Sequence, residues 1–411
     1  MAKLIDEYIA EGIALVKTEK IPIAHAAKRI IEKYQIQDFT VNALRKRITT
    51  GINNQRWNNP YDISDFEVEC AKKGINPEDV TGYWAKGEYF SIHVSNNQSD
   101  ESTLLSQIQH ILDTYKPSVV VVPMATEISV QKALKIVISD THVGMEANEN
   151  NHSIFKYEYN EDVFKSNLDH VLKSIKKEYH THGRFEKVYL QHLGDSMDGW
   201  NATTTRGGHR LPQNLSNTGQ FTVFVFGYLN YVEQVVAMNI ADEINIVMIV
   251  NCNHAGDIGA LAAITIKGIL ERVYDPERVK VVIQYEFIDN YEYGDHTFIM
   301  THGKDKEHMR NGLPKNLDAK TTNYINSYID HYEIATRYIH FEKGDLHCSN
   351  VERSKKFDYR NFMSFAPPSG WVQTNFMDSY SGYSIQVVPK HSGEISHCDY
   401  VFEFKKAKRI T

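Results

Sequence analysis

The chain has 411 residues, which is enough for two or three domains of ordinary size. Hydrophobic residues make up 42% and charged residues 24%, a balance that supports a packed core and excludes wholesale disorder. The formal net charge of -7, from 45 Lys+Arg and 52 Asp+Glu, argues against a protein that coats nucleic acid along its whole length. The charge is uneven, because residues 1–60 carry ten basic and six acidic side chains, or +4, which leaves -11 for the remainder.

Cysteine usage and hydropathy favour a soluble protein in the cytoplasm. The four cysteines lie far apart without a C-x-x-C pair, so reduced thiols are expected rather than a disulfide framework. The first residues include Asp6 and Glu7 where a signal peptide needs an apolar run. The longest apolar stretches, such as 246–250, have the length of strands, so we expect no membrane partner.

Residues 1–60 are predicted to form a small all-α domain. Apolar residues recur at helical spacing over 5–16, 23–34 and 41–48, and Thr40 is a suitable N-cap for the third helix. The polar face of that third helix carries Arg45 and Lys46, with Arg47 at its flank. Two short helices followed by a basic one resemble a helix-turn-helix, which predicts a DNA-binding module containing these three residues. The alternative is a helical bundle whose charged face is only solvated. An asparagine-rich stretch at residues 53–60 is expected to act as a linker.

Residues 61–130 are predicted to be an accessory or linking region, whose role the sequence does not indicate. A helix is expected near 66–73, a hairpin within 84–94, and an amphipathic helix over 104–115. Residues 131–411 then form the main domain. There β-branched runs alternate with helical patterns such as 162–179 and 221–238, which is typical of an α/β or α+β domain. The expected strands are 135–140, 188–193, 244–250, 297–300 and 337–341.

Each of these five strands ends at or near residue types that bind metals. Loops after neighbouring strands of an α/β sheet gather at the carboxyl edge, so these side chains are expected to converge. The five groups follow one another at intervals of about 45 to 60 residues, which fits strand–helix–strand units better than chance turn chemistry. The groups are Asp140 with His142, Asp195 with Asp198, Asn253 with His254, His302, and Asp345 with His347.

This order of motifs resembles the calcineurin-like metallophosphoesterase superfamily, whose marks are D-x-H, G-D-x-x-D, G-N-H-[DE], a lone His and G-H-x-H. The resemblance covers residues 134–350 and implies a β-sandwich flanked by helices across the C-terminal domain. It also implies a centre with two divalent metal ions, in which Asp195 bridges the pair. By the same resemblance, one ion is held by Asp140, His142 and His347, and the other by Asn253, His302 and Asp345.

The resemblance further implies a reaction. A hydroxide activated by the two metals attacks phosphorus, His254 donates a proton to the leaving oxygen, and Asp198 orients His254. Carboxylate, imidazole and amide ligands without thiolate suit Mn²⁺ first, with Fe or Zn²⁺ as alternatives.

The sequence departs from the family pattern at several positions. Asp345 stands where the pattern has the first His of G-H-x-H, and a carboxylate there can still bind a hard cation. Ala255 replaces the acid after Asn-His, and Cys252 replaces the preceding Gly; alternation along the strand predicts that Cys252 is a buried thiol. Gly199 stands where the protein Ser/Thr phosphatases of the superfamily have Arg, which disfavours a phosphoprotein substrate.

These features favour a hydrolase of phosphodiester bonds, most simply a DNA nuclease that its N-terminal helices bring to nucleic acid. The loop 199–214 contains Arg206 and Arg210 and either contacts substrate phosphates or is only a polar connection. One alternative function is a phosphomonoesterase or small-nucleotide phosphatase whose N-terminal helices bind a protein partner or a second copy. The other is a DNA-binding protein without activity.

Overall fold

A computed structural model describes residues 2–19, 21–36, 40–58, 82–87, 90–95, 100–117, 130–147, 155–205, 207–305, 312–376 and 380–404. Its contacts divide the chain into two compact units, Met1–Gln98 and Ser99–Thr411. The three-part division at residues 60 and 130 stays a prediction. The helix expected over 66–73 lies outside the described residues.

The first unit begins with three helices packed against one another: α1 (Ala2–Thr18), α2 (Ile23–Tyr34) and α3 (Val41–Asn58). Their shared core contains Ile13, Ile30 and Ile48, which are almost fully buried. The three predicted helices are therefore confirmed. The linker predicted from residue 53 onward is wrong as far as Asn58, since α3 continues through it. Asparagine disfavours a helix by only about half a kcal/mol per residue, so a polar run alone does not end one.

Basic residues on α3 face away from this core. Arg45, Lys46 and Arg47 are exposed, whereas Leu44 and Ile48 on either side of them are buried. Thr40 accepts a hydrogen bond from the Ala43 amide at 3.2 Å, as an N-cap should. A hairpin, β1 (Gly82–Gly87) with β2 (Phe90–Ser95), completes the described part of the unit and confirms the predicted hairpin.

The second unit contains a six-stranded sheet that carries most of the predicted strands. Its order is β13-β12-β3-β4-β5-β6, and β3 to β6 run parallel. The β12 strand pairs antiparallel with both of its neighbours. The strands are β3 (Val130–Ile138), β4 (Phe185–His192), β5 (Ala241–Ile249), β6 (Val279–Gln284), β12 (Gly382–Pro389) and β13 (Ser396–Val401).

A five-stranded sheet has the order β10-β11-β9-β8-β7. The β8–β9 and β9–β11 pairs are parallel, and the two edge pairs are antiparallel. The strands are β7 (Asp289–Tyr293), β8 (His296–Thr301), β9 (Tyr338–Lys343), β10 (Asn350–Arg353) and β11 (Asp358–Asn361).

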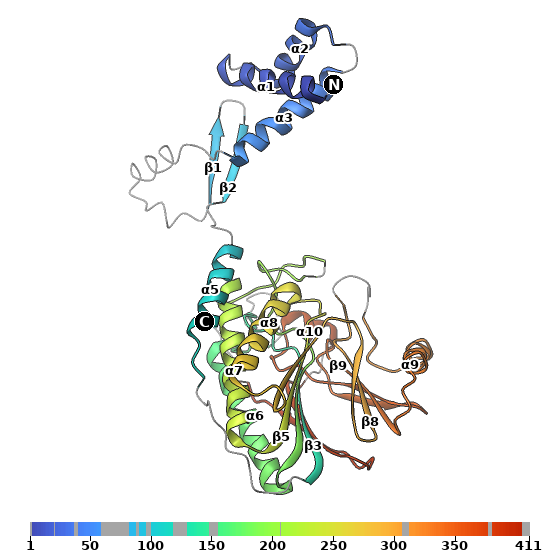
Figure 1. The fold of residues 1–411 in the computed structure, drawn as a ribbon. Coiled ribbons are helices and arrows are strands. Elements are labelled where there is room, and N and C mark those ends of the chain that lie inside the picture. Colours follow the sequence, from blue (N-terminus) through green and yellow to red (C-terminus); the bar gives the residue numbers. More distant parts are fainter. Residues whose placement is uncertain are drawn as a thin grey trace. The chain divides into compact units, whose positions relative to one another are not determined.

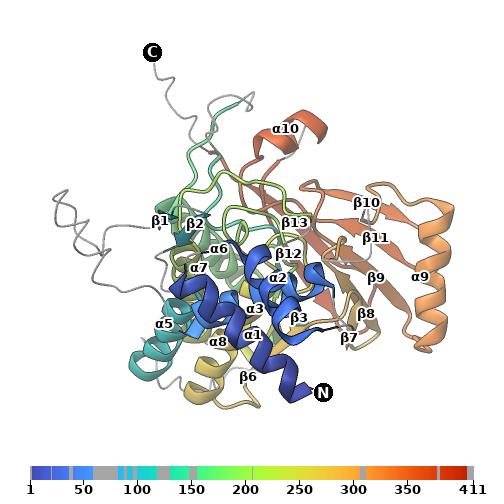
Figure 2. The same cartoon turned by 90° about the horizontal axis from the view of Figure 1, so that it is seen from above.

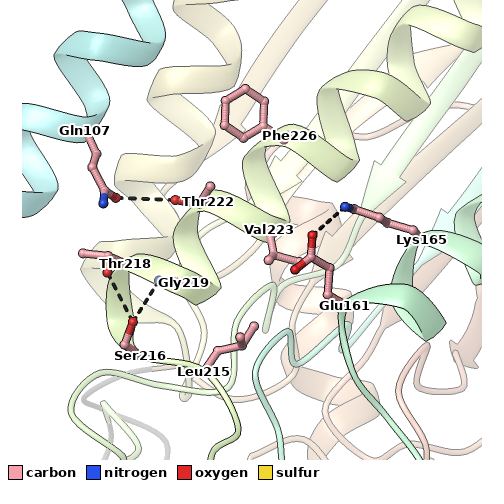
Figure 3. Close-up of a pocket in the computed structure, with 10 residues that line it drawn as sticks. All are labelled: Gln107, Glu161, Lys165, Leu215, Ser216, Thr218, Gly219, Thr222, Val223 and Phe226. Atoms are coloured by element: carbon pink, nitrogen blue, oxygen red, sulfur yellow. Dashed lines mark hydrogen bonds and ion pairs between the residues drawn. The ribbon is translucent and has the colours of Figure 1, made fainter.

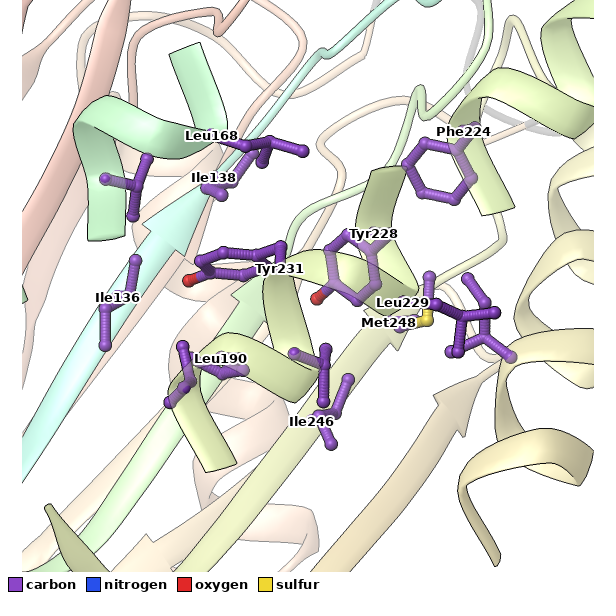
Figure 4. Packing of buried hydrophobic residues seen from close by; sticks show 14 of the residues in the cluster. Ile136, Ile138, Leu168, Leu190, Phe224, Tyr228, Leu229, Tyr231, Ile246 and Met248 are labelled. Atoms are coloured by element: carbon purple, nitrogen blue, oxygen red, sulfur yellow. The ribbon is translucent and has the colours of Figure 1, made fainter. Parts of the chain in front are cut away.

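The two sheets pack face to face as a β-sandwich with helices on both outer faces (Figures 1 and 2). Val137 and Val247 of the larger sheet meet Met300 of the smaller one between the layers. The outer face of the larger sheet packs against α6, α7 and α8, with Tyr228 and Tyr231 of α7 at the centre (Figure 4). The α/β sandwich flanked by helices is thus as predicted. The helices are α5 (Asp100–Thr114), α6 (Glu161–His182), α7 (Asn217–Met238), α8 (Gly256–Val273), α9 (Ala319–His331) and α10 (Gly370–Phe376).

Two helices, α7 and α5, occupy positions in the fold that their sequences alone do not reveal. By length and composition α7 could cross a membrane, but 67% of its apolar window is buried inside the unit, so it is a core helix. The helix predicted over 104–115 is α5, and its Leu104 and Ile111 join the core of the second unit. Part of the accessory region therefore belongs with the sandwich.

A buried ion pair joins the two sheets. Lys135 of β3 pairs with Glu342 of β9, and both side chains are almost completely buried. Gln191 of β4 donates a second hydrogen bond to Glu342 at 3.0 Å. Burial lowers the pKa of Lys135 to about 8, although Glu342 works in the opposite direction. Removing one partner of a buried ion pair is strongly destabilising, so this pair ties β3 to β9 across the two sheets.

Candidate metal centre

The predicted site residues lie at the carboxyl ends of five strands. Asp140 and His142 follow β3, Asp195 and Asp198 follow β4, and Asn253 and His254 follow β5 in the larger sheet. His302 follows β8, and Asp345 and His347 follow β9 in the smaller sheet. The parallel strands within each sheet end at one edge, and the sandwich brings the two edges together.

The backbone at these strand ends is unusual. Asp140, His142, Asp195, Asp345 and His347 all have positive φ, between +39° and +66°. Non-glycine residues rarely adopt this conformation, and the cost of order 1–3 kcal/mol each is typical of functional sites. The chain therefore reverses sharply where β3, β4 and β9 stop.

Two glycines permit close approach between these turns. Gly194 has φ +104°, and a Cβ there would lie 2.8 Å from Nδ1 of His302. A Cβ on Gly344 would lie 2.1 Å from the Ser139 hydroxyl oxygen and 2.8 Å from Oδ2 of Asp140. These two motif positions therefore exclude a side chain.

The first cluster consists of Asp140, His142 and His347. Oδ1 of Asp140 lies 3.3 Å from Nε2 of His347 and 3.8 Å from Nε2 of His142. The two Nε2 atoms are themselves 3.3 Å apart. All three residues are buried, and Oδ1 of Asp140 has no hydrogen-bond partner among the described residues. A carboxylate oxygen and two imidazole nitrogens that face one small space are suited to a shared cation.

The second cluster consists of Asp195, Asn253 and His302. Nε2 of His302 lies 3.0 Å from Oδ2 of Asp195 and 3.1 Å from Oδ1 of Asn253. Nδ1 of His302 donates to the Leu193 carbonyl at 2.8 Å, which leaves Nε2 facing the cluster. Asp140 also lies within 4.8 Å of Asp195 and His302 through ligand atoms, so the two clusters are contiguous.

Charge compensation within the clusters is strong. Although burial opposes ionisation, His347 and then His302 hold the pKa of Asp140 well below its usual range. Burial also opposes protonation of His302, but Asp195 and Asp140 outweigh it and raise its pKa to about 10. The two buried carboxylates are thus stabilised by nearby positive charge. Without a metal ion this charge is the imidazolium of His302. The donor set of two carboxylates, three imidazoles and one amide fits divalent cations.

The predicted ligand Asp345 is not part of these clusters. It is half-buried, and its Oδ2 lies 3.2 Å from the position of a Cβ on Gly312. Its carboxylate therefore approaches the loop after β8, and its role as a ligand stays a prediction.

His254 and Asp198 lie beside the first cluster. Nδ1 of His254 donates to the Asp198 backbone carbonyl at 2.9 Å, whereas the Asp198 carboxylate is 3.9 Å away. That carboxylate is closer to Nδ1 of His142, at 3.4 Å. Asp198 therefore orients His254 through its main chain and faces His142 with its side chain. The His254 amide also donates to Oδ1 of Asp195 at 3.0 Å. Burial lowers the pKa of His254.

Several supporting residues have no motif to reveal them. The Ser364 hydroxyl donates to the Asp140 carbonyl at 3.0 Å, and Tyr159 donates to the Thr141 carbonyl. On α7 the fully buried Gln220 accepts from the Asp198 amide at 3.1 Å. A glutamine within the apolar α7 sequence was a signal for such a role. Cys252, with 1% exposure, is a buried free thiol as predicted.

The loop after Asp198 lies against the turn that carries His254. The Thr205 hydroxyl donates to the His254 carbonyl at 2.6 Å. A Cβ on Gly256 would lie 2.4 Å from the Thr205 hydroxyl oxygen. An isolated bridge between Thr203 and Arg210 ties the loop to itself, and the Arg210 side chain is exposed. Arg206 lies outside the described residues.

A cavity of about 490 Å³ lies away from these clusters, between α5, α6 and the start of α7 (Figure 3). Its polar groups pair with one another: Thr222 donates to Gln107, and Lys165 to Glu161. None of the clustered side chains lines it.

Solved structures similar to this chain include an archaeal phosphodiesterase, with 13% identity, a TM-score of 0.30, and coverage of 65% of this chain and 99% of the other. A conserved predicted phosphoesterase from Streptococcus pneumoniae TIGR4 has 14% identity, a TM-score of 0.24, and coverage of 66% and 98%. Vacuolar protein sorting 29 from Cryptosporidium parvum has 12% identity, a TM-score of 0.28, and coverage of 66% and 98%. No protein-family model and no curated protein matches the sequence.

Similarities with such low identity and TM-scores assign no activity to this chain. The sandwich has helices on both outer faces, and residues from all five motifs follow strands that end around one buried cluster of carboxylates and imidazoles. The sandwich and the gathering of the motif residues at its strand ends are those expected from the order of motifs in the sequence.

Proposed function

We propose that the protein is a metal-dependent phosphodiesterase, and that its substrate is DNA. The observation that carries the proposal is the pair of contiguous clusters, Asp140–His142–His347 and Asp195–Asn253–His302. Two buried carboxylates surrounded by imidazoles provide for two divalent cations, and such centres are suited to displacement at phosphorus.

The first cluster would hold one cation and the second cluster the other, and Asp195 would contribute to both. Such cations lower the pKa of water and neutralise charge on phosphoryl oxygens. The role of Asp140, Asp195, Asn253 and the three imidazoles would be to bind the two cations and fix their positions. Manganese is the ion we expect, because carboxylate, amide and imidazole together suit it, and Fe or Zn²⁺ would fit the same set.

His254 in its protonated, imidazolium form is proposed to supply the proton for the leaving oxygen from Nε2. Its Nδ1 is engaged by the Asp198 carbonyl, so Nε2 is the atom left to face a substrate. Its side chain is 20% exposed, unlike the fully buried His302, and can therefore reach a bound ester. The backbone contact with Asp195 ties its position to the metal clusters.

Nucleic acid as the substrate is supported by basic residues outside the clusters. Arg45, Lys46 and Arg47 form an exposed basic surface on α3, which we propose contacts phosphates in the manner of a helix-turn-helix. Arg210 is exposed on a loop that is hydrogen-bonded to the His254 turn through Thr205, and we propose that Arg210 and Arg206 contact substrate phosphates. The free thiols are those expected of a protein that acts in the cytoplasm.

A panel of metals and substrates tests the function. With Mn²⁺, we expect hydrolysis of labelled single- or double-stranded DNA and of bis(p-nitrophenyl) phosphate, with weaker turnover of p-nitrophenyl phosphate. Hydrolysis of the monoester without cleavage of DNA would replace the nuclease by a phosphomonoesterase or nucleotidase. Binding of DNA without turnover of any ester would leave only a DNA-binding protein.

Replacement of the proposed proton donor tests its role. His254→Gln should reduce the kcat for DNA by about 100-fold or more, because the deoxyribose leaving oxygen needs a proton. With bis(p-nitrophenyl) phosphate the loss should be much smaller, since p-nitrophenolate leaves without protonation. Metal content should stay unchanged. The control is His331→Gln, an exposed residue in the last turn of α9. Equal losses on both substrates would contradict the assignment.

The basic surface of α3 is tested by separating binding from turnover. Replacing Arg45, Lys46 and Arg47 with Ala should weaken DNA binding, because fewer phosphates are neutralised. The slope of log affinity against log salt should become shallower by about one for each phosphate that the variant no longer neutralises. Turnover of bis(p-nitrophenyl) phosphate should not change.

A triple variant of exposed lysines on α6, with Lys173, Lys176 and Lys177 replaced by Ala, removes the same charge as a control. Equal effects of the two triple variants on DNA binding would mean that only net charge matters.

A further inference from the structure

Three of the exposed large aromatic side chains lie on segments that hydrogen bonds connect to the turn carrying Asp140. Phe155, Trp371 and Tyr380 are 51%, 63% and 74% exposed. We call this set the aromatic rim. Tryptophan is among the more buried residue types on average, so such exposure in an ordered part of a fold calls for an explanation. The helix α10, which carries Trp371, lies at the same edge of the sandwich as the strand ends (Figure 1).

The segment that leads into α10 is fastened to the first metal-binding turn. The Ala366 amide donates to the Asp140 carbonyl at 3.1 Å, and the Phe365 amide donates to the Ser139 carbonyl at 2.8 Å. Trp371 follows Ala366 by only five positions, so the Trp371 Cα lies within about 18 Å of the Ala366 Cα even if this short segment were fully extended.

A buried glutamine joins Phe155 to α10. Gln373, 4% exposed, accepts from the Phe155 amide at 2.7 Å and donates to the Phe155 carbonyl at 2.9 Å. The chain after Phe155 reaches Tyr159, which donates to the Thr141 carbonyl between the ligands Asp140 and His142. Phe155 is thus connected to the turn of Asp140 through Tyr159, and Trp371 is connected to it through Ala366. Gln373 joins the two segments to each other.

Tyr380 has a corresponding anchor. Gly382, two residues on, donates from its amide to the Ser364 carbonyl at 2.8 Å, and the Ser364 hydroxyl donates to the Asp140 carbonyl. All three aromatic residues therefore stand on backbone that is hydrogen-bonded, within a few residues, to the turn holding Asp140.

We propose that the aromatic rim stacks the bases of a single-stranded nucleic acid whose phosphate lies in the metal centre. The inference rests on the proposed function, and it adds that the substrate is recognised by its bases. The metal clusters attract a phosphoryl group, and aromatic rings a few residues away offer flat surfaces, a combination that matches a nucleotide chain. Stacking on aromatic side chains accepts any base, so it gives affinity without sequence preference. A lipid or peptide would not need both features.

Binding to two oligomers of equal length, one a short oligothymidylate and one abasic, tests the proposal. Both carry phosphorothioate linkages that resist hydrolysis, are fluorescently labelled, and are bound to the full chain in Mn²⁺. Trp371→Ala should weaken oligothymidylate binding by about 10-fold and leave the abasic oligomer unaffected. Trp371→Phe should restore most of the affinity. The control is Tyr332→Ala, a comparably exposed aromatic residue after α9.

Intrinsic fluorescence gives a second readout that a folding defect would not reproduce. Oligothymidylate should quench tryptophan emission of the wild type more than that of Trp371→Phe, because one stacked indole is missing from the variant. Equal quenching in both proteins, equal affinity of Trp371→Ala and wild type, or equal loss on both oligomers would overturn the proposal.

The two proposals fail in different ways. If no metal supports diester hydrolysis, the proposed function is wrong, but a base-dependent loss of binding in Trp371→Ala would still establish the rim. If the wild type hydrolyses bis(p-nitrophenyl) phosphate yet binds the two oligomers equally, the rim is wrong and the phosphodiesterase stands.

Discussion

The mutual repulsion of two buried carboxylates is the constraint on which this structure depends. Asp140 and Asp195 are almost wholly inside the protein, at 0% and 2% exposure, and their side chains belong to one cluster. Buried charges of like sign are tolerated only with compensating positive charge close by. His302 provides it through protonation, as its raised pKa shows. Divalent cations would do so more completely, which is why a metal centre explains the arrangement.

The fold brings these groups together at some energetic cost. Five residues at the strand ends adopt positive φ, and Gly194 and Gly344 leave room for the Ser139, Asp140 and His302 side chains. The sheets that carry the turns are joined by the buried Lys135–Glu342 pair. Hydrogen bonds from Ser364, Ala366 and Tyr159 then hold the first ligand turn and extend its rigidity to the aromatic rim. The same contacts thus shape the site and fix the surface around it.

Much of this was predictable, and the reasons for the rest are specific. The strands that end in ligands were visible because they are buried and rich in β-branched residues. The short β10 and β11 were not, because they are polar four-residue strands placed by pairing with β9. Motif order predicted most of the side chains that form the two clusters, but it could not show that the Asp345 carboxylate approaches Gly312 or that the Asp198 carbonyl accepts from His254. Helix propensity alone placed the end of α3 too early, since asparagine is only a weak helix breaker.

The central claim is that the clustered carboxylates and imidazoles hold two divalent metal ions. Anomalous diffraction from crystals of the full chain grown with Mn²⁺ tests it most directly. The expected result is two anomalous peaks about 3.5–4 Å apart. One should be ligated by Asp140, His142 and His347 and the other by Asn253 and His302, with Asp195 contacting both. Crystals with no anomalous peak at these side chains, at a manganese concentration that supports turnover, would contradict it.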